Sequence, residues 1–315
     1  MYKYILILLF MGVNINAQML HRTKVEMGTF ITISVDEKNK KYIEDGFRIV
    51  KDVDLSLSSY NKNALVYKLN RDKKISLDDY LYEALSLSQK YYKKSDGYFD
   101  ITVGTITKDL YRFGQKERVP TPQELQSAKV DFKGLIFDTK EASLAKGVKI
   151  DLGGMGKGFT VDKIAEHYRA NNLKKALISA SGDIRCLDVC SVEVDNPFDD
   201  GFIVSFKTAK RDLGISTSGN YNRYVVAIKN NHLINPKSKT SQDKFISITL
   251  IAEMPNSDLD AYATASSVMP IKKAYEFLNI LDVGYIILKS DKELVLSDNL
   301  SKYTRGLIIH YTAKK

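Results

Sequence analysis

The sequence predicts an α+β fold. Helical and strand patterns both occur along its 315 residues, but they do not alternate strictly as β-α-β units. Residues 190–251 indicate a run of short strands, and helical patterns precede and follow this run. The length allows one large domain or two small ones, and 44% hydrophobic with 27% charged residues is ordinary for a globular protein.

The N-terminus is typical of an export signal. Lys3 is followed by an apolar run over residues 5–13 and by Ala17 at a plausible cleavage site. The run is too short to span a bilayer, and a buried first strand is the alternative. The pattern favours residues 1–17 as a signal peptide and residues 18–315 as the folded domain. We therefore expect an exported, periplasmic protein that is soluble or peripherally bound to the membrane.

Hydrophobic periodicity predicts the elements of the N-terminal half. Apolar residues alternate over the first element and recur at helical spacing in the next two. Ser76 and Asp79 resemble a capping pair, and Pro122 suits the first turn of a short helix. In order, these elements are a strand over 29–35 and helices over 42–57, from Ser76 to the stop signal at 95–97, and from Thr121.

The C-terminal half alternates between helical and strand patterns around several turn signals. Apolar residues at helical spacing follow a glycine-rich segment, and Gly, Asn and Pro punctuate the strands. The predicted elements are a helix through 161–168, a strand over 176–179 with a turn at 182–183, the strands of 190–251 with turns at 196–197, 218–219 and 235–236, helices over 258–269 and 274–281, and strands over 285–288 and 293–296.

The glycine-rich segment over residues 148–159 is the most informative part of the chain. It reads as a short apolar strand that breaks into a glycine cluster and then opens a helix. Backbone N–H groups in such a loop can approach a phosphate closely, and the helix start favours an anion. It is not a Walker A loop, because Gly158 follows Lys157 where Ser or Thr is required. An ordinary turn is the alternative.

Two further sets of residues suggest chemistry. Asp260 and Thr264 are four residues apart in a predicted helix, so their oxygens lie on one face and suit a hard cation such as Mg²⁺. The alternative is that both oxygens serve the helix itself. His232 lies beside a turn and is either a general base or a surface residue. Asp100 and Asp183 follow turn signals and are either caps or ligands.

Cysteine content and charge restrict the remaining possibilities. Cys186 and Cys190 either close a small disulfide or remain thiols, and no nearby histidine completes a zinc site. The net charge of +9 comes from basic residues spread among acidic ones. This distribution favours a solvated basic surface over nucleic-acid binding.

Eight short motifs occur in a fixed order along the chain. They are 27–29, 58–60 with Asn70 ten residues on, 96–104, 151–162, 181–185, 217–221, 232–236 and 260–265. This series resembles the ApbE family of FAD:protein FMN transferases over nearly the whole mature chain. The resemblance implies a single α+β unit of two closely packed lobes with FAD between them, in a protein that is typically exported.

The resemblance also implies roles for particular residues. His232 would take the proton from an acceptor hydroxyl, and Lys157 would neutralise charge on the FAD pyrophosphate. Mg²⁺ would be held by Asp260, Thr264 and the backbone carbonyl of Gly156. The residues that would contact FAD are Met27, Tyr60, Tyr98, Phe99, Asp100, Lys157, Asp162, Gly182, Asp183 and Ile234.

The implied reaction is transfer of FMN. A Thr or Ser hydroxyl of an acceptor flavoprotein attacks the FMN phosphorus, a phosphoester forms and AMP leaves. The acceptor would be a flavin subunit of a membrane redox complex or a secreted flavoprotein. Ser181 stands where a second glycine is usual, and Asn235 replaces the aspartate common before the proline. Two alternatives therefore stay open: an FAD pyrophosphatase that uses water, and a non-catalytic FAD-binding protein.

Overall fold

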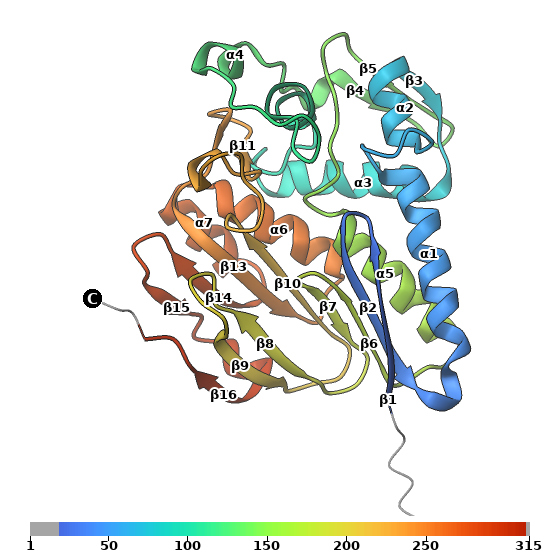
Figure 1. Ribbon diagram of the computed structural model, residues 1–315, viewed down its shortest axis with the longest axis vertical. Coiled ribbons are helices and arrows are strands. Elements are labelled where there is room, and N and C mark those ends of the chain that lie inside the picture. The colour runs from blue at the N-terminus through green and yellow to red at the C-terminus, as the bar shows by residue number, and fades with distance from the viewer. Residues whose placement is uncertain (1–18, 313–315) are drawn as a thin grey trace, which may run out of the picture.

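An antiparallel sheet of eight strands forms the centre of the molecule (Figure 1). The structure is a computed structural model that describes residues 19–312, so the predicted signal peptide lies outside the described residues. Every neighbouring pair in the sheet is antiparallel. In spatial order its strands are β1 (Met19–Glu26), β2 (Thr29–Asp36), β6 (Ala176–Ala180), β7 (Asp183–Cys186), β10 (Leu213–Gly219), β13 (Phe245–Ala252), β14 (Gly284–Lys289) and β15 (Leu294–Leu296).

Helices cover one face of this sheet. α5 contacts β6 and β7, and α6 contacts β10 and β13, while α1 packs beside α5. α1 and α7 have apolar residues at helical spacing on one face, whereas α6 is buried on nearly all sides. Ile164 and Tyr168 of α5 are fully buried. The bounds are α1 (Lys41–Leu57), α5 (Gly156–Ala170), α6 (Asn256–Val268) and α7 (Ile271–Asn279).

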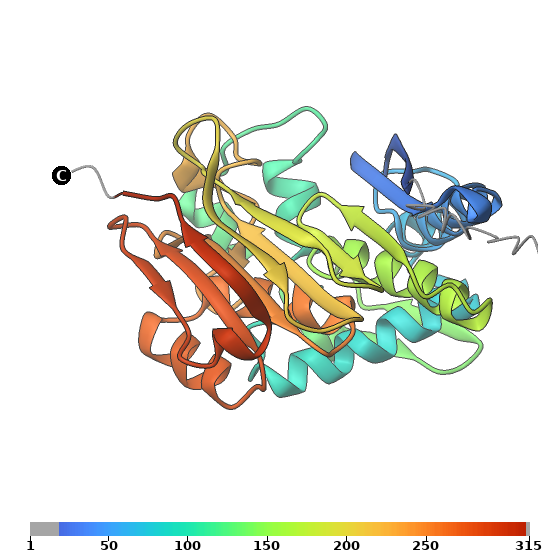
Figure 2. The same ribbon diagram turned by 90° about the horizontal axis from the view of Figure 1, so that it is seen from below.

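A three-stranded sheet packs against the large sheet. Its strands are β8 (Ser191–Asp195), β9 (Phe202–Thr208) and β16 (Thr304–Ile309), in the order β16-β9-β8. Ile203 and Phe206 of β9 belong to the same buried cluster as Ile248 and Leu250 of β13. Figure 2 shows the same strands from below. β13 is therefore buried along almost its whole length, with Ile246 as the one partly exposed position.

A second, smaller lobe lies above the sheet in Figure 1. It contains α2 (Leu65–Asp72), α3 (Asp79–Lys94), α4 (Pro122–Ser127), a π-helix over Thr105–Tyr111, and the sheet of β3 (Lys74–Ser76), β5 (Glu141–Leu144) and β4 (Leu135–Phe137). One buried cluster includes Leu85 of α3 together with Ile248 and Leu250 of β13. The two lobes thus share a core and form one α+β fold, as the sequence predicts.

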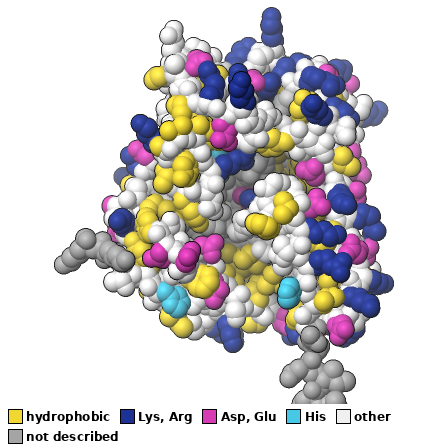
Figure 3. All heavy atoms as spheres, viewed as in Figure 1, with side chains coloured by type: hydrophobic (Ala, Val, Ile, Leu, Met, Phe, Trp, Pro, Cys, Tyr) yellow, Lys and Arg dark blue, Asp and Glu magenta, His cyan; other side chains and the backbone are white. Residues whose placement is uncertain are grey.

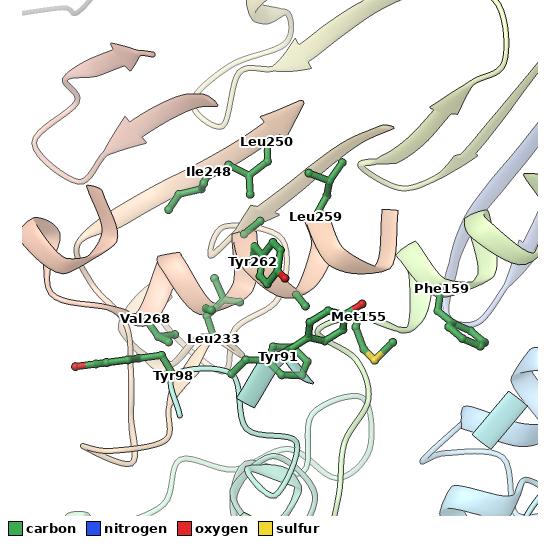
Figure 4. Packing of buried hydrophobic residues seen from close by; sticks show 14 of the residues in the cluster. Tyr91, Tyr98, Met155, Phe159, Leu233, Ile248, Leu250, Leu259, Tyr262 and Val268 are labelled. Carbon is green, nitrogen blue, oxygen red and sulfur yellow. The ribbon is translucent and has the colours of Figure 1, made fainter. Parts of the chain in front are cut away.

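Aromatic packing joins the lobes beneath α6. Tyr91 of α3 makes edge-to-face contacts with Phe99 and with Tyr262 of α6, at centroid distances of 5.5 and 5.6 Å. Figure 4 shows Tyr91 and Met155 close together under this helix. Ser88 lies within 3.4 Å of the Met155 sulfur. Met155, the residue before α5, is therefore held by α3. This contact helps to position the glycine-rich segment relative to the large sheet.

Most predicted elements are confirmed, and the differences are instructive. The second predicted helix begins at Asp79 instead of Ser76, because Asp78 caps it by accepting from the Leu81 N–H, and Ser76 ends strand β3. α2, the π-helix and the strands β1, β3, β4, β5 and β16 were not predicted, and the predicted turn at 218–219 is wrong because both residues belong to β10. The capping box of Thr121 and Glu124 is present. No helix within residues 19–312 is long and apolar enough to cross a membrane.

Candidate active site

The glycine-rich segment is an extended loop, and the predicted strand over its first residues is wrong. Its one bridge pairs Val103 with Lys149. A side chain takes the place of a neighbouring strand: the Asn70 amide accepts from the Ile150 N–H at 2.7 Å and donates to the Ile150 carbonyl at 2.8 Å. The Asp151 N–H donates to Ile101. The buried backbone is thus satisfied without a β-ladder.

The glycines of this segment allow close packing against α6. A Cβ at Gly158 would lie 2.3 Å from the carbonyl oxygen of Asn256, and one at Gly154 would lie 3.0 Å from Thr264 Cγ2. No side chain fits at Gly158 without displacing a helix. The sequence suggested that these glycines clear the way for a phosphate. The structure shows that they also bring the start of α5 against α6.

This contact assembles a buried charge cluster from three elements. Lys157 Nζ of α5 lies 2.6 Å from Asp183 Oδ2 of β7 and 3.3 Å from Asp260 Oδ2 of α6. The same Asp260 oxygen accepts from the Gly158 N–H at 3.2 Å. Ser216, which faces Asp183 across the β7–β10 ladder, donates to the other Asp183 oxygen. The Asp183 and Asp260 side chains are almost fully buried.

The charges of this cluster depend on one another. Burial raises the pKa of Asp183, the negative charge of Asp260 raises it further, and the Lys157 ammonium only partly offsets these effects. Burial lowers the pKa of Lys157, but Asp183 and Asp260 together raise it above the ordinary lysine value. Lys157 therefore stays charged at neutral pH, as the one cation beside two buried carboxylates.

The predicted metal ligands lie around this cluster. Thr264 Oγ1 is 3.2 Å from Ser218 Oγ, and Gly154 lies directly against Thr264. Asp260 and Thr264 offer oxygen donors from one helix face, as a hard cation requires. The Gly156 carbonyl accepts from Thr160 Oγ1 at 2.8 Å and retains a second lone pair, so its predicted role as a metal ligand stays a prediction. Among residues 19–312, no three His, Cys, Asp or Glu side chains form a metal-binding group.

Asp162 holds the start of α6. Its two carboxylate oxygens accept from the Asn256 and Ser257 N–H groups at 2.7 and 2.8 Å, and the residue is 6% exposed. A carboxylate at a helix N-terminus satisfies amides that have no partner within the helix. Its contacts are thus those of a residue that fixes α6, and with it Asp260, against α5. Its predicted contact with FAD stays a prediction.

Two tight hairpins border the cluster. Met27-Gly28 joins β1 to β2, and Ser181-Gly182 joins β6 to β7, with positive φ at all four residues. This backbone suits two-residue hairpins, and it explains how Ser181 is accommodated where a glycine is usual. Thr160 Oγ1 lies 3.3 Å from the Met27 sulfur, so this turn touches α5. Gly182 accepts from the Thr217 N–H at 3.0 Å.

The segment Tyr98–Asp100 lies on the other side of the glycine-rich loop. Phe99 is buried 3.3 Å from the Cβ position of Gly154. Tyr98 carries Lys237 and Lys273 over its ring, at 4.3 and 4.9 Å from the centroid. Asp100 borders a cavity of about 380 Å³, and burial raises its pKa to about 6 although Thr102 donates to it. The contact between Phe99 and Gly154 places this segment beside the glycine-rich loop, and its predicted contacts with FAD stay predictions.

A second group of residues centres on Arg223, which sequence analysis missed. Its guanidinium donates to the Tyr60 hydroxyl and lies over the Tyr60 and Phe113 rings at 5.5 and 5.6 Å. Its carbonyl accepts from the His232 N–H at 3.2 Å and lies 3.1 Å from His232 Nδ1. Arg223 thus connects Tyr60 to His232. The sequence feature that could have pointed to Arg223 is its position two residues after the motif 217–221.

His232 is electrostatically coupled to the lysine cluster. Burial, the charge of Arg223 and the charge of Lys157 lower its pKa to about 4. Nδ1 faces a carbonyl and therefore carries the proton, which leaves Nε2 as the basic atom. The negative charge of Asp151 acts in the opposite direction and raises the pKa of His232. His232 is thus a neutral base at physiological pH.

Asp151 and Lys108 connect the glycine-rich segment to Tyr60. Asp151 pairs with Lys108 at 3.0 Å and accepts from the Thr107 hydroxyl at 2.7 Å and from the Gly153 N–H at 3.1 Å. Burial opposes ionisation, but the Lys108 charge and these contacts lower the pKa of Asp151 to about 2. Lys108 Nζ also lies 3.6 Å above the Tyr60 ring. No role for either residue follows from their spacing in the sequence.

The residues after His232 explain one departure from the family pattern. Ile234 is buried in a cluster with Phe113 and Val225. Asn235 donates from Nδ2 to the Val268 carbonyl at the end of α6, at 2.7 Å, and its Oδ1 accepts from the Lys237 N–H. An ionised aspartate could not make the first bond. Asn235 therefore supports α6 instead of serving as a carboxylate helper.

Figure 3 shows a hollow in the face that it draws. Acidic and basic side chains lie at its floor and rim, and hydrophobic side chains gather beside it. At the far end of β7, Cys186 and Cys190 form a disulfide, which settles the alternative that the sequence left open. The charge cluster and the neutral histidine are features that a site for a phosphate-bearing substrate requires.

Comparison with protein families now adds to this geometry. Residues 27–287 match the ApbE family. The chain belongs to the ApbE family. This ApbE protein shares 27% identity over 83% of its length with the FAD:protein FMN transferase of Haemophilus influenzae, of which 82% is covered. It shares 26% identity with the enzyme of the same name from Treponema pallidum, over 93% of this chain and 91% of that one.

Solved structures confirm the fold of this ApbE protein. The crystal structure of the ApbE protein from Thermotoga maritima aligns with a TM-score of 0.84 at 23% identity, over 91% of this chain and all of that one. The flavin transferase ApbE from Vibrio cholerae aligns with a TM-score of 0.78 at 18% identity, over 91% and 99% of the two chains. The predicted family and fold class are confirmed, and the roles of individual residues stay predictions.

Proposed function

We propose that this ApbE protein is an Mg²⁺-dependent FAD:protein FMN transferase. It attaches FMN through a phosphoester to a Thr or Ser of an acceptor flavoprotein and releases AMP. The observation that carries the proposal is the buried Lys157–Asp183–Asp260 cluster beside a neutral His232. The names of the curated relatives support the same activity.

The residues of this chain have distinct parts in the proposed reaction. His232 Nε2 accepts the proton from the acceptor hydroxyl, because Nδ1 is held by the Arg223 carbonyl. The hydroxyl oxygen bonds to the FMN phosphorus, the bond to the AMP oxygen breaks, and AMP leaves with that oxygen. Lys157 contributes positive charge beside the pyrophosphate. Met27, Tyr60 and the Tyr98–Asp100 segment orient the flavin end.

Asp260 and Thr264 are the proposed side-chain ligands of Mg²⁺. Their oxygen donors share one face of α6 and lie against the glycine-rich segment. The Gly156 carbonyl, which also accepts from Thr160 Oγ1, is the proposed backbone ligand. When bound, the ion would neutralise charge on the pyrophosphate oxygens. Asp183 borders this position as a further carboxylate.

We also propose that the protein is exported and works in the periplasm. The pattern of residues 1–17 supports export. The disulfide between Cys186 and Cys190 suits an oxidising compartment. The acceptor would then be a flavin subunit of a membrane redox complex or another exported flavoprotein.

A mass spectrum tests the proposal. The protein is mixed with FAD, MgCl₂ and a flavin subunit of a membrane redox complex, and we expect the subunit to gain the mass of one FMN while AMP appears. His232→Asn should slow this transfer about 10²- to 10⁴-fold, and a chelator should stop it. Free FMN formed without any acceptor would favour a pyrophosphatase. Unchanged FAD after long incubation with several acceptors would favour a non-catalytic FAD-binding protein.

A further inference from the structure

The chain between Arg223 and His232 forms a small hairpin whose tip extends into solvent. Its base is closed by the His232 N–H, which donates to the Arg223 carbonyl, and by a bridge between Tyr224 and Asn231. The Val225 N–H donates to Asn230 at 3.1 Å. The proposed base His232 is therefore the last residue of this hairpin (residues 223–232).

The base of hairpin 223–232 is anchored firmly. Val225 is 5% exposed and packs in the cluster that contains Phe113 and Ile234. Asn231 is fully buried, and its amide donates to the carbonyls of Ile228 and Gln242, both at 2.8 Å. The hairpin thus has a fixed root, and its exposed residues are held in place relative to His232.

Apolar side chains cover the outer surface of hairpin 223–232. Tyr224, Val226 and Ile228 are 43%, 87% and 49% exposed. Val226 also has φ 65°, a left-handed backbone conformation that a β-branched residue rarely adopts. Asn or Asp would suit that backbone and solvent better. Exposure of three alternating apolar residues, one of them with a strained backbone, does not stabilise the fold. It indicates a binding role for this surface.

The charge around hairpin 223–232 is positive. Residues 213–242 contain no Asp or Glu, whereas Arg223 and Lys229 lie within the hairpin. The neighbouring Gly114 lies 3.4 Å from Arg223 at its Cβ position and belongs to the loop 112–118, which carries three basic residues and one acidic residue, Glu117. A partner that covers the hairpin would thus gain from carboxylates as well as from apolar side chains.

We propose that hairpin 223–232 is the docking surface for the acceptor protein, and that it binds an extended acceptor segment with apolar and acidic side chains beside the modified hydroxyl. The inference rests on the proposed function. Because His232 ends the hairpin, an acceptor segment bound along it would bring its hydroxyl toward His232. Apolar contact with Tyr224, Val226 and Ile228 would then position that hydroxyl before transfer.

Substitution of Val226 tests the docking surface without weakening the fold. Val226→Asn removes the apolar contact, and Asn tolerates the left-handed backbone, so we expect unchanged or higher thermal stability. Val189→Asn is the matched control, since Val189 is an exposed valine next to the disulfide, at the opposite end of the β7–β10 pair. Binding of FAD should be the same in both variants and in the wild type.

The probes are short synthetic peptides with one central threonine. One carries apolar neighbours and terminal aspartates, a second has lysines in place of the aspartates, and a third has serines in place of the apolar residues. We expect the first to receive FMN most efficiently. Val226→Asn should lower kcat/KM for that peptide about tenfold, and Val189→Asn should leave it unchanged.

The outcomes separate this inference from the proposed function. Equal transfer to all three peptides, or equal activity of Val226→Asn and wild type, would overturn the docking surface and leave the transferase in place. If no peptide is modified, fluorescence anisotropy decides: binding that Val226→Asn weakens supports the hairpin but not the transferase, and no binding overturns the hairpin. Vesicles of anionic lipid that bind the wild type but not Val226→Asn would assign the surface to a membrane instead.

Discussion

The two sides of the site are built in different ways. The Lys157 cluster is drawn from two helices and a central strand, and its carboxylates are buried and hydrogen-bonded. The Arg223–His232 side comes from a hairpin and loops, with a cation over aromatic rings and exposed apolar residues at its tip. The first side has its charges in place before any substrate arrives, whereas the second presents a surface to a partner.

This difference indicates a division of labour. Buried charges are favourable only when their partners are fixed, so a change to one member of the Lys157 cluster should have a large effect on chemistry. Contacts on the hairpin are partly solvated, and each contributes less. The two sides meet where the charge of Lys157 lowers the pKa of His232. Substitutions on each side can therefore show whether the division is real.

Loss of the Asp260 charge should give the largest effect among substitutions in the Lys157 cluster. Asp260→Asn removes a carboxylate that contacts Lys157 and the Gly158 N–H, and that we propose as a metal ligand. We expect FMN transfer to fall about 10²- to 10³-fold or more, measured as kcat/KM with saturating MgCl₂.

Asp258→Asn is the matched control on the same helix. Asp258 accepts from the Tyr91 hydroxyl at 2.6 Å and from Lys90 at 2.8 Å, away from the Lys157 cluster. This variant should lose stability to denaturant but keep most of its transfer rate. Equal loss of activity in the two variants would mean that α6 acts only as a structural element.

Substitutions of Gly158 and Gly156 should show which glycine is required for the packing of α5 against α6. Gly158→Ala places a methyl group 2.3 Å from the Asn256 carbonyl, so we expect a loss of about 1–3 kcal/mol in the free energy of unfolding, or more. At Gly156 a Cβ meets nothing within 4 Å. Gly156→Ala should thus be neutral or slightly stabilising. Urea titrations of both variants measure the difference, and comparable stabilities would show that α5 and α6 move apart easily.

The sequence predicted the buried side of the site better than the exposed side. The i, i+4 spacing of Asp260 and Thr264 is a local property of one helix, so it could be read before the fold was known. The contact of Lys157 with Asp183 and Asp260 depends on how α5 and α6 cross the sheet, and spacing alone does not define it. The resemblance pointed to these residues together, and the structure supplied their partners.

Long-range packing explains what was missed. Asn70 replaces a neighbouring strand for Ile150, eighty positions along the chain, so the local pattern wrongly predicted a strand there. The contacts of Asp162 with the first amides of α6 were missed for the same reason, because that helix begins far away in sequence. Arg223 has no periodic signal, because its contacts come from tertiary structure alone.

The smallest expected effect is a change in the titration of His232, and it tests whether the two sides are coupled. Its pKa of about 4 in the folded protein lies below the value of about 6.5 for a free histidine. The unfolded chain therefore binds more protons between these values, so His232 contributes stability that is present above pH 6.5 and is lost as the pH falls toward 4.

Proton NMR resolves this titration, and His232→Asn assigns the resonance among the four histidines. Arg223→Gln should raise the pKa of His232 more than Lys157→Gln does, because the charge of Arg223 is the larger cause. If only Arg223→Gln changes the pKa of His232, the hairpin and not the Lys157 cluster sets that pKa. If neither variant changes it, burial sets the pKa and the two sides act independently.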